Sequence, residues 1–333
     1  MHRSVLGLAA GLVAGMATTA AIGADPAPKL GERVARVGDE IVICGQLFHT
    51  TAPVVLWTDP GGYDAYRTER RFVALDEAPW KNEGGNGTLQ SPARFGLRRG
   101  LPADLAARVR GGGWDLPALQ GVVDQFVIHF DACGTSKKCF EVLHDQRGLS
   151  VQFMLDIDGT IYQTLDAKEG ARHATKANGR SIGIEIANIG TSATDKPDNF
   201  DRWYEKTADG TVRIKVPADA DLHNKAIVPR PIRPEPVVGH IQGRAYKQYD
   251  LTPEQYDSLI KLTATLCTVF PKIKCEAPRD PDGKVTDHAL PADVYNSYQG
   301  VMGHYHVQTN KNDPGPAFQW DKVIDGAKAL MKP

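Results

Sequence analysis

A long apolar run, 122–130 (VVDQFVIHF), constrains the fold more than any other segment of the chain. Its length and apolar character predict a buried strand, which needs a sheet around it and helices packed on that sheet. The run contains a histidine close to its end, His129. A histidine at that place either packs in the core or serves as a ligand at the edge of the sheet, and the run alone leaves both readings open.

Further strands and helices alternate along the chain. Strands are predicted at 151–157 and 160–164, joined by the turn Asp158-Gly159, and at 181–188 (SIGIEIAN). Helices are predicted at 103–109, from Trp114 onward, at 138–146, from 252 and at 319–331; the fourth has a threonine cap followed by Pro253. This alternation indicates the α/β class, with one mixed central β-sheet flanked by helices.

The first 24 residues are interpreted as a signal peptide. Arg3 is followed by an uncharged run of mainly Ala, Gly, Leu and Val that ends in small residues before Asp25. A positive start, an apolar stretch and a small-residue end are typical of export signals. The alternative is a retained membrane anchor, which the spacing of Gly7, Gly11 and Gly15 would suit but the weak hydrophobicity of Ala and Gly disfavours. We therefore expect an exported protein, periplasmic or secreted, with no stable membrane span after cleavage.

Two regions follow the signal. Residues 25–105 hold short β-like runs at 33–37, 40–45, 53–58 and 71–75, and are interpreted as a small β-rich N-terminal module of undisclosed role. Residues 106–333 hold the alternating strands and helices. Within them, a Pro- and Asp-rich stretch at about 190–250 is interpreted as a long insertion, and a second irregular stretch covers about 271–298.

Charge and cysteine content narrow the partners and the compartment. The chain has 39 Lys+Arg against 40 Asp+Glu, a formal net charge of −1, so it lacks the basic surplus of a general nucleic-acid binder. Its five cysteines include two close pairs, Cys133 with Cys139 and Cys267 with Cys275, which predict local disulfides in an oxidising compartment. Cys44 is left over as a buried thiol.

Three short stretches carry groups suited to hydrolysis. His129 ends the first strand, Glu185 alternates with apolar residues in SIGIEIAN, and 303–315 (GHYHVQTNKNDPG) holds His304, Lys311 and Asp313. Two histidines and an aspartate form a ligand set for one zinc ion that leaves a fourth position open. Glu185 would take the proton from the attacking water, and Lys311 would stabilise the oxyanion that forms on the substrate carbonyl.

These stretches resemble the zinc-dependent N-acetylmuramoyl-L-alanine amidases of the type 2 amidase and peptidoglycan recognition protein family. The resemblance runs from about Gln125 to Trp320, and its most specific part is the Lys-x-Asp-Pro-Gly-Pro ending. It implies that His129, His304 and Asp313 bind zinc, and that Glu185 and Lys311 act on the substrate. It also implies that His173, in ARHA, faces the substrate cleft, and that Cys133 and Cys139 form a disulfide.

The chain departs from the family pattern at several positions. Val151 stands where some members carry a catalytic tyrosine, and is predicted to face the substrate; members without that tyrosine use a later glutamate, which Glu185 matches. Gln152 stands where a histidine often occurs. His240, in VVGH within the insertion, imitates a ligand strand, but it lacks the Lys-x-Asp-Pro-Gly ending and is predicted to lie in the cleft instead. His306 competes with His304 for the metal, because the two would point to opposite faces of an extended segment.

The leading hypothesis is an exported zinc amidase that hydrolyses the amide between N-acetylmuramic acid and L-alanine of peptidoglycan. One alternative is a non-catalytic module that binds peptidoglycan or muropeptides; such relatives typically lose a zinc ligand, whereas this chain retains three candidates. The other is a zinc peptidase that cuts within the stem peptide, which would release an amino terminus other than L-alanine.

Overall fold

The computed structural model describes residues 30–79, 94–110 and 113–332. Residues Arg36–Pro333 form one compact unit, and the few described residues before Arg36 belong to a separate one. The predicted signal peptide, 1–24, lies outside the described residues. Within them, no helix combines the length and the apolar character that a membrane crossing requires.

A six-stranded mixed sheet forms the centre of the larger unit, as predicted. Its strand order is β13-β4-β7-β5-β6-β3. Four strands run parallel: β13 (Gly300–Gly303), β4 (Gln125–Phe130), β7 (Ser181–Ile186) and β5 (Phe153–Leu155). Strand β6 (Ile161–Gln163) is antiparallel to β5, because the turn at 158–159 joins the two directly. The carboxyl ends of β13, β4 and β7 therefore meet at one edge, where the predicted site residues begin.

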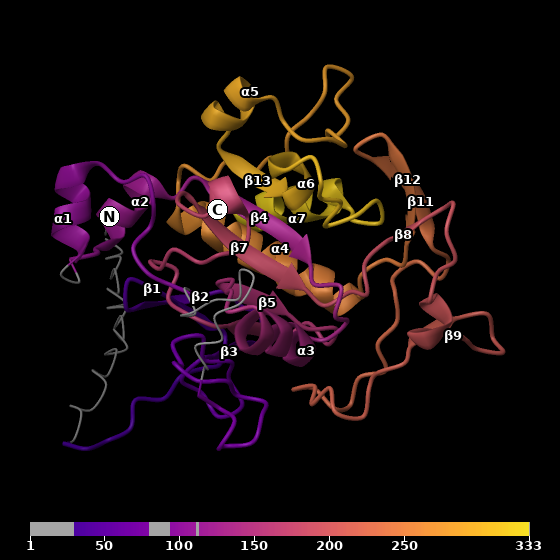
Figure 1. Ribbon diagram of the computed structural model, residues 1–333, viewed down its shortest axis with the longest axis horizontal. Coiled ribbons are helices and arrows are strands. Elements are labelled where there is room, and N and C mark those ends of the chain that lie inside the picture. The colour runs from indigo at the N-terminus through magenta and orange to yellow at the C-terminus, as the bar shows by residue number, and fades with distance from the viewer. Residues whose placement is uncertain (1–29, 80–93, 111–112, 333) are drawn as a thin grey trace, which may run out of the picture. The chain divides into compact units, whose positions relative to one another are not determined.

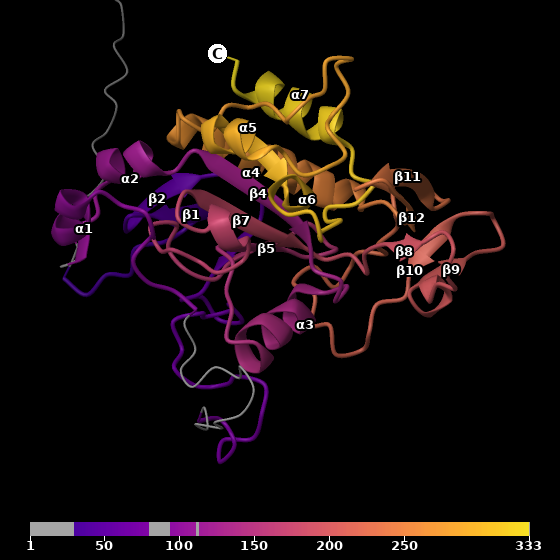
Figure 2. The same ribbon diagram turned by 45° about the horizontal axis from the view of Figure 1, so that its top comes forward.

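Helices cover both faces of this sheet (Figures 1 and 2). Helices α4 (Pro253–Val269) and α7 (Trp320–Leu330) pack on one face, in a core cluster with Ile128 and Ile184. The other face carries α3 (Ser136–Phe140) and its π-helical continuation η1 (Glu141–Gln146), which pack on Met154 and Tyr162. Helix α4 begins as predicted, with Thr252 as N-cap in a capping box and Pro253 in the first turn.

The N-terminal strands are part of this assembly. The strands β1 (Glu40–Ile43) and β2 (Gln46–His49) form a hairpin, and β3 (Val54–Leu56) pairs in parallel with β6 at the edge of the main sheet. Residues 33–37 and 71–75 form no strand. The backbone of β3 hydrogen-bonds to the main sheet, so part of the predicted N-terminal module forms the edge of that sheet and belongs to the compact unit Arg36–Pro333.

Buried polar contacts reinforce that attachment. Arg98 is 2% exposed, and its guanidinium donates to the carbonyl oxygens of Ala167 and Ser181 at 2.6 and 2.8 Å. Its segment is thereby fixed on the main sheet. The two short helices that follow, α1 (Ala103–Arg110) and α2 (Leu116–Val122), lead into β4.

The insertion is more ordered than its weak periodicity indicates. It contains β8 (Ser192–Ala193), the 3-10 turn η3 (Phe200–Arg202), the hairpin β9 (Tyr204–Lys206) and β10 (Val212–Ile214), and the hairpin β11 (Val237–Ile241) and β12 (Arg244–Gln248). Strands β11, β12 and β8 form a small antiparallel sheet beside the main one (Figure 1). The stretch at 271–298 holds the short helix α5 (Ala292–Ser297).

The predicted disulfides are not formed in this structure. All five cysteines carry free thiols. The thiols of each predicted pair are nevertheless close enough to raise the pKa of one member, Cys133 acting on Cys139 and Cys275 on Cys267. The pairing therefore stays a prediction for which the chain brings the right residues together.

We predict that Glu40 stabilises the N-terminal turn through its charge. Burial raises the pKa of Glu40, but the backbone N–H groups of Val37 and Gly38, at 2.7 and 2.9 Å, and the Arg36 guanidinium outweigh it and lower the pKa to about 2. Glu40→Gln should reduce the free energy of unfolding at pH 7 by about 1–3 kcal/mol in urea denaturation. Because the folded pKa is the lower one, this difference should shrink from about pH 4.5 down through pH 2.

The exposed Glu77→Gln serves as the control and should change stability by less than about 0.5 kcal/mol. A gap between wild type and Glu40→Gln that grows on acidification would contradict the assignment.

Candidate functional site

The three predicted metal ligands meet at the carboxyl edge of the sheet. His129 lies near the end of β4, and His304 opens the helical turn α6 (His304–Val307) directly after β13. Because Gly303 of β13 is paired with Ile128 of β4, the two histidines are neighbours, with ring centroids 4.4 Å apart. The loop before α7 supplies Asp313, whose carbonyl accepts the Tyr305 N–H at 3.1 Å. The three ligand atoms lie within 4.8 Å of one another.

The electrostatics of this group match those of a metal-binding site. Asp313 Oδ2 lies 2.8 Å from His129 Nδ1 and 3.0 Å from His304 Nδ1, and all three residues are buried. Burial raises the pKa of Asp313, but the two histidines lower it well below its usual range. Burial lowers the pKa of His129 to about 4, which keeps its ring neutral and able to donate a lone pair.

Outer hydrogen bonds decide which ring nitrogens face inward. Gln308 Oε1 accepts the Thr175 hydroxyl at 3.1 Å and lies 2.8 Å from His304 Nε2. An oxygen in that position requires the hydrogen of His304 to sit on Nε2, which leaves Nδ1 with its lone pair. Such an outer partner is the usual orienting device for a metal-bound histidine.

A second chain of hydrogen bonds orients His129. Its Nε2 lies 3.0 Å from His173 Nδ1, and His173 Nε2 lies 3.3 Å from the Ser181 hydroxyl. With Nε2–H of His129 donating to His173, and Nε2–H of His173 donating to Ser181, His129 also turns a bare Nδ1 inward. Gly183 makes room for this chain, since a Cβ there would lie 2.6 Å from the His173 ring.

The donor set therefore fits a metal cation. Two bare ring nitrogens and a carboxylate oxygen facing one point repel one another unless a cation lies among them. Two imidazoles and one carboxylate are the ligand types that catalytic zinc takes, with the remaining position directed at substrate. The donor types and the hydrogen bonds that orient them thus both suit a zinc ion.

A cavity of about 310 Å³ opens onto the group. Glu185 and Lys311, the two residues predicted to act on the substrate, both line it, as does His173. Glu185 is half-buried on β7, directly opposite His129 in the register of the two strands. Burial raises the pKa of Glu185 well above its usual value, and the carboxylates of Asp313 and Asp131 raise it further. A carboxylate in such a place is a competent base.

Two predicted cleft residues lie elsewhere. Val151 is completely buried in the apolar cluster beneath α3, together with Phe140 and Met154, so it cannot contact a ligand in the cavity. His240 is exposed on β11, opposite Ala245 in the small sheet, and is not among the residues that line the cavity. Both predictions rested on local resemblance, and the packing of the surrounding segments directs these side chains away.

His306 does not compete for the metal. Residues 304–307 form a helical turn rather than an extended strand. His306 is buried, with Nδ1 accepting the Gly303 N–H at 2.9 Å and Nε2 donating to the Thr286 carbonyl at 2.7 Å. Gln152 is likewise structural, because its side-chain oxygen accepts the Gly183 N–H at 2.8 Å.

Several residues of the cavity were not predicted. Gln308 lies four positions after His304, a spacing that brings side chains together on a helical turn, and this could have indicated it. Arg147 and Arg172 come from loops, and the sequence contains no signal for them. Asp131 follows β4, and its Oδ1 accepts three backbone N–H groups; burial nevertheless raises its pKa to about 7.

A second group of potential metal ligands is weaker. Asp39, Glu40 and His49 also bring ligand atoms within 4.8 Å. Glu40 already accepts backbone N–H groups and pairs with Arg36 at 3.3 Å, so its carboxylate is not available. The group lies on the N-terminal hairpin and is partly exposed.

Comparison with known proteins covers most of this region. A family model described as N-acetylmuramoyl-L-alanine amidase (Amidase_2) matches residues 119–316, more than half of the chain, including all three candidate ligands. No curated protein sequence matches the chain.

Solved structures give more distant matches. The N-acetylmuramyl-L-alanine amidase AmiD from E. coli, in complex with anhydro-N-acetylmuramic acid-L-Ala-D-gamma-Glu-L-Lys, is 18% identical over 61% of this chain and 57% of its own, with a TM-score of 0.34. The endolysin LysCS from Clostridium intestinale is 18% identical over 64% of this chain and 88% of its own, with a TM-score of 0.32. The chain thus spans just over half the length of AmiD.

We predict that Gln308 sets metal affinity through His304. Gln308→Leu removes the oxygen that holds the hydrogen on His304 Nε2, so Nδ1 is no longer fixed as the inward donor. Zinc affinity, measured by competition with a chromogenic chelator, should fall by about 10–100-fold. The matched control Gln146→Leu, exposed on η1, should bind zinc as the wild type does. Equal affinities for the two variants would contradict the role given to Gln308.

Proposed function

The chain belongs to the N-acetylmuramoyl-L-alanine amidase family, and from this premise we propose that it is an exported zinc hydrolase that cleaves the amide bond between N-acetylmuramic acid and L-alanine in peptidoglycan. One observation carries the proposal: the inward-facing donors of His129, His304 and Asp313 converge at a cavity that Glu185 and Lys311 also line. A binding module needs the cavity alone, whereas hydrolysis needs the donors, the base and the cation together.

The proposed chemistry uses each group at one step. A zinc ion held by the three ligands would supply Lewis-acid chemistry, which polarises the scissile carbonyl and acidifies water. Glu185 takes a proton from the attacking water as its oxygen bonds to the carbonyl carbon. The Lys311 ammonium stabilises the negative charge that develops on the carbonyl oxygen. Glu185 then gives the proton to the departing nitrogen, so the products are the lactyl carboxylate and the free amine of L-alanine.

The raised pKa of Glu185 supports this double role. A carboxylate kept partly out of water and close to other carboxylates holds a proton more tightly than an exposed one. It is therefore a better base towards water and can carry the proton until the amine departs. His173 is a positioning residue in this scheme, since it contacts the His129 ring and acts through it.

Export is supported by the sequence alone. Residues 1–24 have the composition of a signal peptide, and peptidoglycan lies outside the cytoplasmic membrane. The two cysteine pairs fit an oxidising compartment.

Product analysis tests the reaction and its metal. Incubation of the zinc-loaded protein with a defined muropeptide should release a free peptide that begins with L-alanine, identified by mass spectrometry. Chelation should abolish the release and added zinc should restore it. A new amino terminus other than L-alanine would support a stem-peptide peptidase instead, and intact substrate with zinc-loaded protein would leave only a binding module.

Glu185→Gln tests the base. The amide keeps the shape of the side chain but cannot accept the proton, so kcat should fall by about 10²–10⁴-fold while zinc content is retained. The control Glu205→Gln, exposed on β9, should retain full turnover. Unaltered turnover of Glu185→Gln would remove Glu185 from the mechanism, and loss of zinc would give it a ligand role instead.

A further inference from the structure

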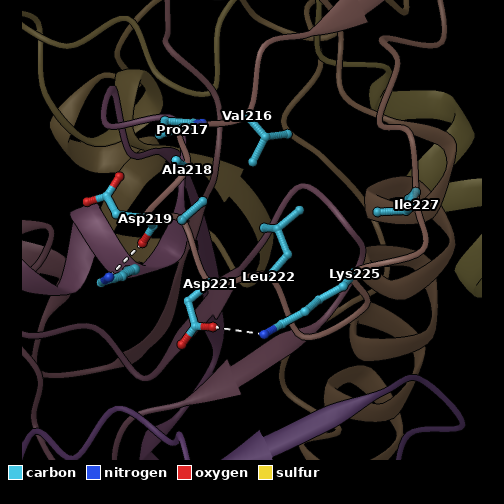
Figure 3. Close-up of a pocket in the computed structure, with 10 residues that line it drawn as sticks. Val216, Pro217, Ala218, Asp219, Asp221, Leu222, Lys225 and Ile227 are labelled. Atoms are coloured by element: carbon cyan, nitrogen blue, oxygen red, sulfur yellow. Dashed lines mark hydrogen bonds and ion pairs between the residues drawn. The ribbon is translucent and has the colours of Figure 1, made fainter.

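A second hollow lies under a loop of the insertion. Loop 215–228 is closed at its base by the Ile214 N–H, which donates to the Pro229 carbonyl at 2.9 Å, as in an Ω-loop. Beneath it lie two cavities of about 490 and 230 Å³ that share Lys137, Asp221, Leu222 and Lys225. In Figure 3 the apolar side chains of the loop and the Asp221–Lys225 ion pair surround the larger one. We call the two cavities together the loop groove.

Defined contacts hold the loop in place. Ala220 and Leu222 are buried against Ile157 and Ala187, at the carboxyl ends of β5 and β7. The Asn224 N–H donates to Asp158 Oδ2 at 2.8 Å. The loop is therefore fixed to the catalytic core by both apolar and polar contacts. Because the loop is already ordered, it loses little conformational entropy when a ligand binds.

The floor of the groove comes from the N-terminal segment and is also fixed. The backbone N–H groups of Arg71 and Phe72 donate to Asp145 at 2.9 and 2.7 Å, and Asp145 lies 2.6 Å from His144. The Arg71 guanidinium lies 5.2 Å from the Tyr63 ring centroid and 5.1 Å from that of Phe72. It therefore rests on two aromatic faces.

The smaller cavity is electropositive. Three cationic side chains, Arg71, Lys137 and Lys225, face one carboxylate, Asp221; the other carboxylate of the groove, Asp219, lines only the larger cavity. Arg71 donates to the Gly62 carbonyl and Lys137 to the Asp219 carbonyl at 2.6 Å. Within the described part of the chain, neither of these two cations forms an ion pair. Their charges are therefore available to an anionic ligand.

Helix α3 and its continuation η1 separate the groove from the catalytic cavity. Lys137 points into the groove, whereas Cys139, Val142 and Leu143 line the catalytic cavity, and the two sites share no lining residue. A ligand that occupied both would pass over one short helical segment. A long polymer can occupy both sites at once, whereas a single muropeptide can be held in the catalytic cavity alone.

We infer that the loop groove is a second binding site for peptidoglycan, which takes a carboxylate-bearing part of the strand away from the bond that is cleaved. Arg71, which rests on the faces of Tyr63 and Phe72, and Lys137 bind the carboxylate, and the apolar loop residues take up methyl groups. This inference rests on the proposed function for the nature of the ligand. It gives the N-terminal segment and the insertion a joint role in holding the polymer.

Two measurements distinguish the loop groove from the catalytic cavity: binding to the polymer and turnover of a small substrate. The zinc-loaded full chain is cosedimented with purified insoluble peptidoglycan on ice, and its kcat/KM is measured on a soluble single muropeptide. The double variant Arg71→Ala/Lys137→Ala should bind the polymer about tenfold more weakly, and added salt should weaken wild-type binding. Its kcat/KM on the soluble muropeptide should stay within about twofold of wild type, because the catalytic cavity is intact.

A matched variant controls for bulk charge. The double variant Lys206→Ala/Arg213→Ala also removes one lysine and one arginine, but from the β9–β10 hairpin of the same insertion. There both residues form ion pairs with glutamates. It should bind polymer as the wild type does. Equal weakening in both double variants, or none in Arg71→Ala/Lys137→Ala, would overturn the inference.

Two further measurements keep the test decisive. If the double variant melts at a lower temperature, Lys137→Gln alone replaces it and should bind about threefold more weakly, because one of the two free cations is lost. Peptidoglycan freed of phosphate polymers should still bind; if only the isolated phosphate polymer binds, the inference is wrong about the ligand. Absence of muropeptide hydrolysis by the wild type would refute the proposed function. The cosedimentation comparison would still test the loop groove, because it does not depend on turnover.

Discussion

The alternation of side chains along β4 and β7 is the constraint on which the rest of the structure depends. Ile128 and Ile184 face α4, and their neighbours His129 and Glu185 face the opposite side, towards the cavity. Because the two strands are parallel and in register, His129, the proposed ligand, and Glu185, the proposed base, lie opposite each other. A slip of one residue in either strand would turn its polar site residue into the apolar core and its isoleucine towards the cavity, so the core itself fixes the positions of His129 and Glu185.

The three buried metal-ligand candidates, His129, His304 and Asp313, depend on one another and on their outer partners for their orientation. Asp313 is a buried carboxylate whose Oδ2 lies 2.8 and 3.0 Å from the two imidazoles, and a bound cation would compensate its charge. Gln308 and His173 lie one contact further out and fix the orientation of the rings. The three proposed ligands and these two outer residues therefore form one hydrogen-bonded network, and removal of an outer residue would alter the donors that a metal meets.

The additions to the catalytic core are built into it. Strand β3 extends the main sheet, and the segment around Arg71 packs on α3 and η1 through Asp145. Loop 215–228 reaches the same helical segment from the insertion, through Lys137. The N-terminal segment and the insertion thus meet on the side of α3 that faces away from the catalytic cavity. In the sequence, the first is interpreted as a separate module and the second as an irregular insertion. Nothing in their sequences indicates this meeting, because it depends on contacts between residues more than 60 positions apart.

The sequence by itself determined the sheet and the covering helices, because period-two alternation and helix caps are local patterns. It also singled out five residues, the three proposed ligands with Glu185 and Lys311, which the structure places around one cavity. It misplaced Val151 and His240, whose neighbours match the family pattern but whose side chains are directed by distant packing. Only the tertiary structure decided that His306 turns away, that Gln308 orients His304, and that the N-terminal strands join the sheet. These outcomes depend on which segments touch, and hydrogen bonds across such contacts leave no local periodicity in the chain.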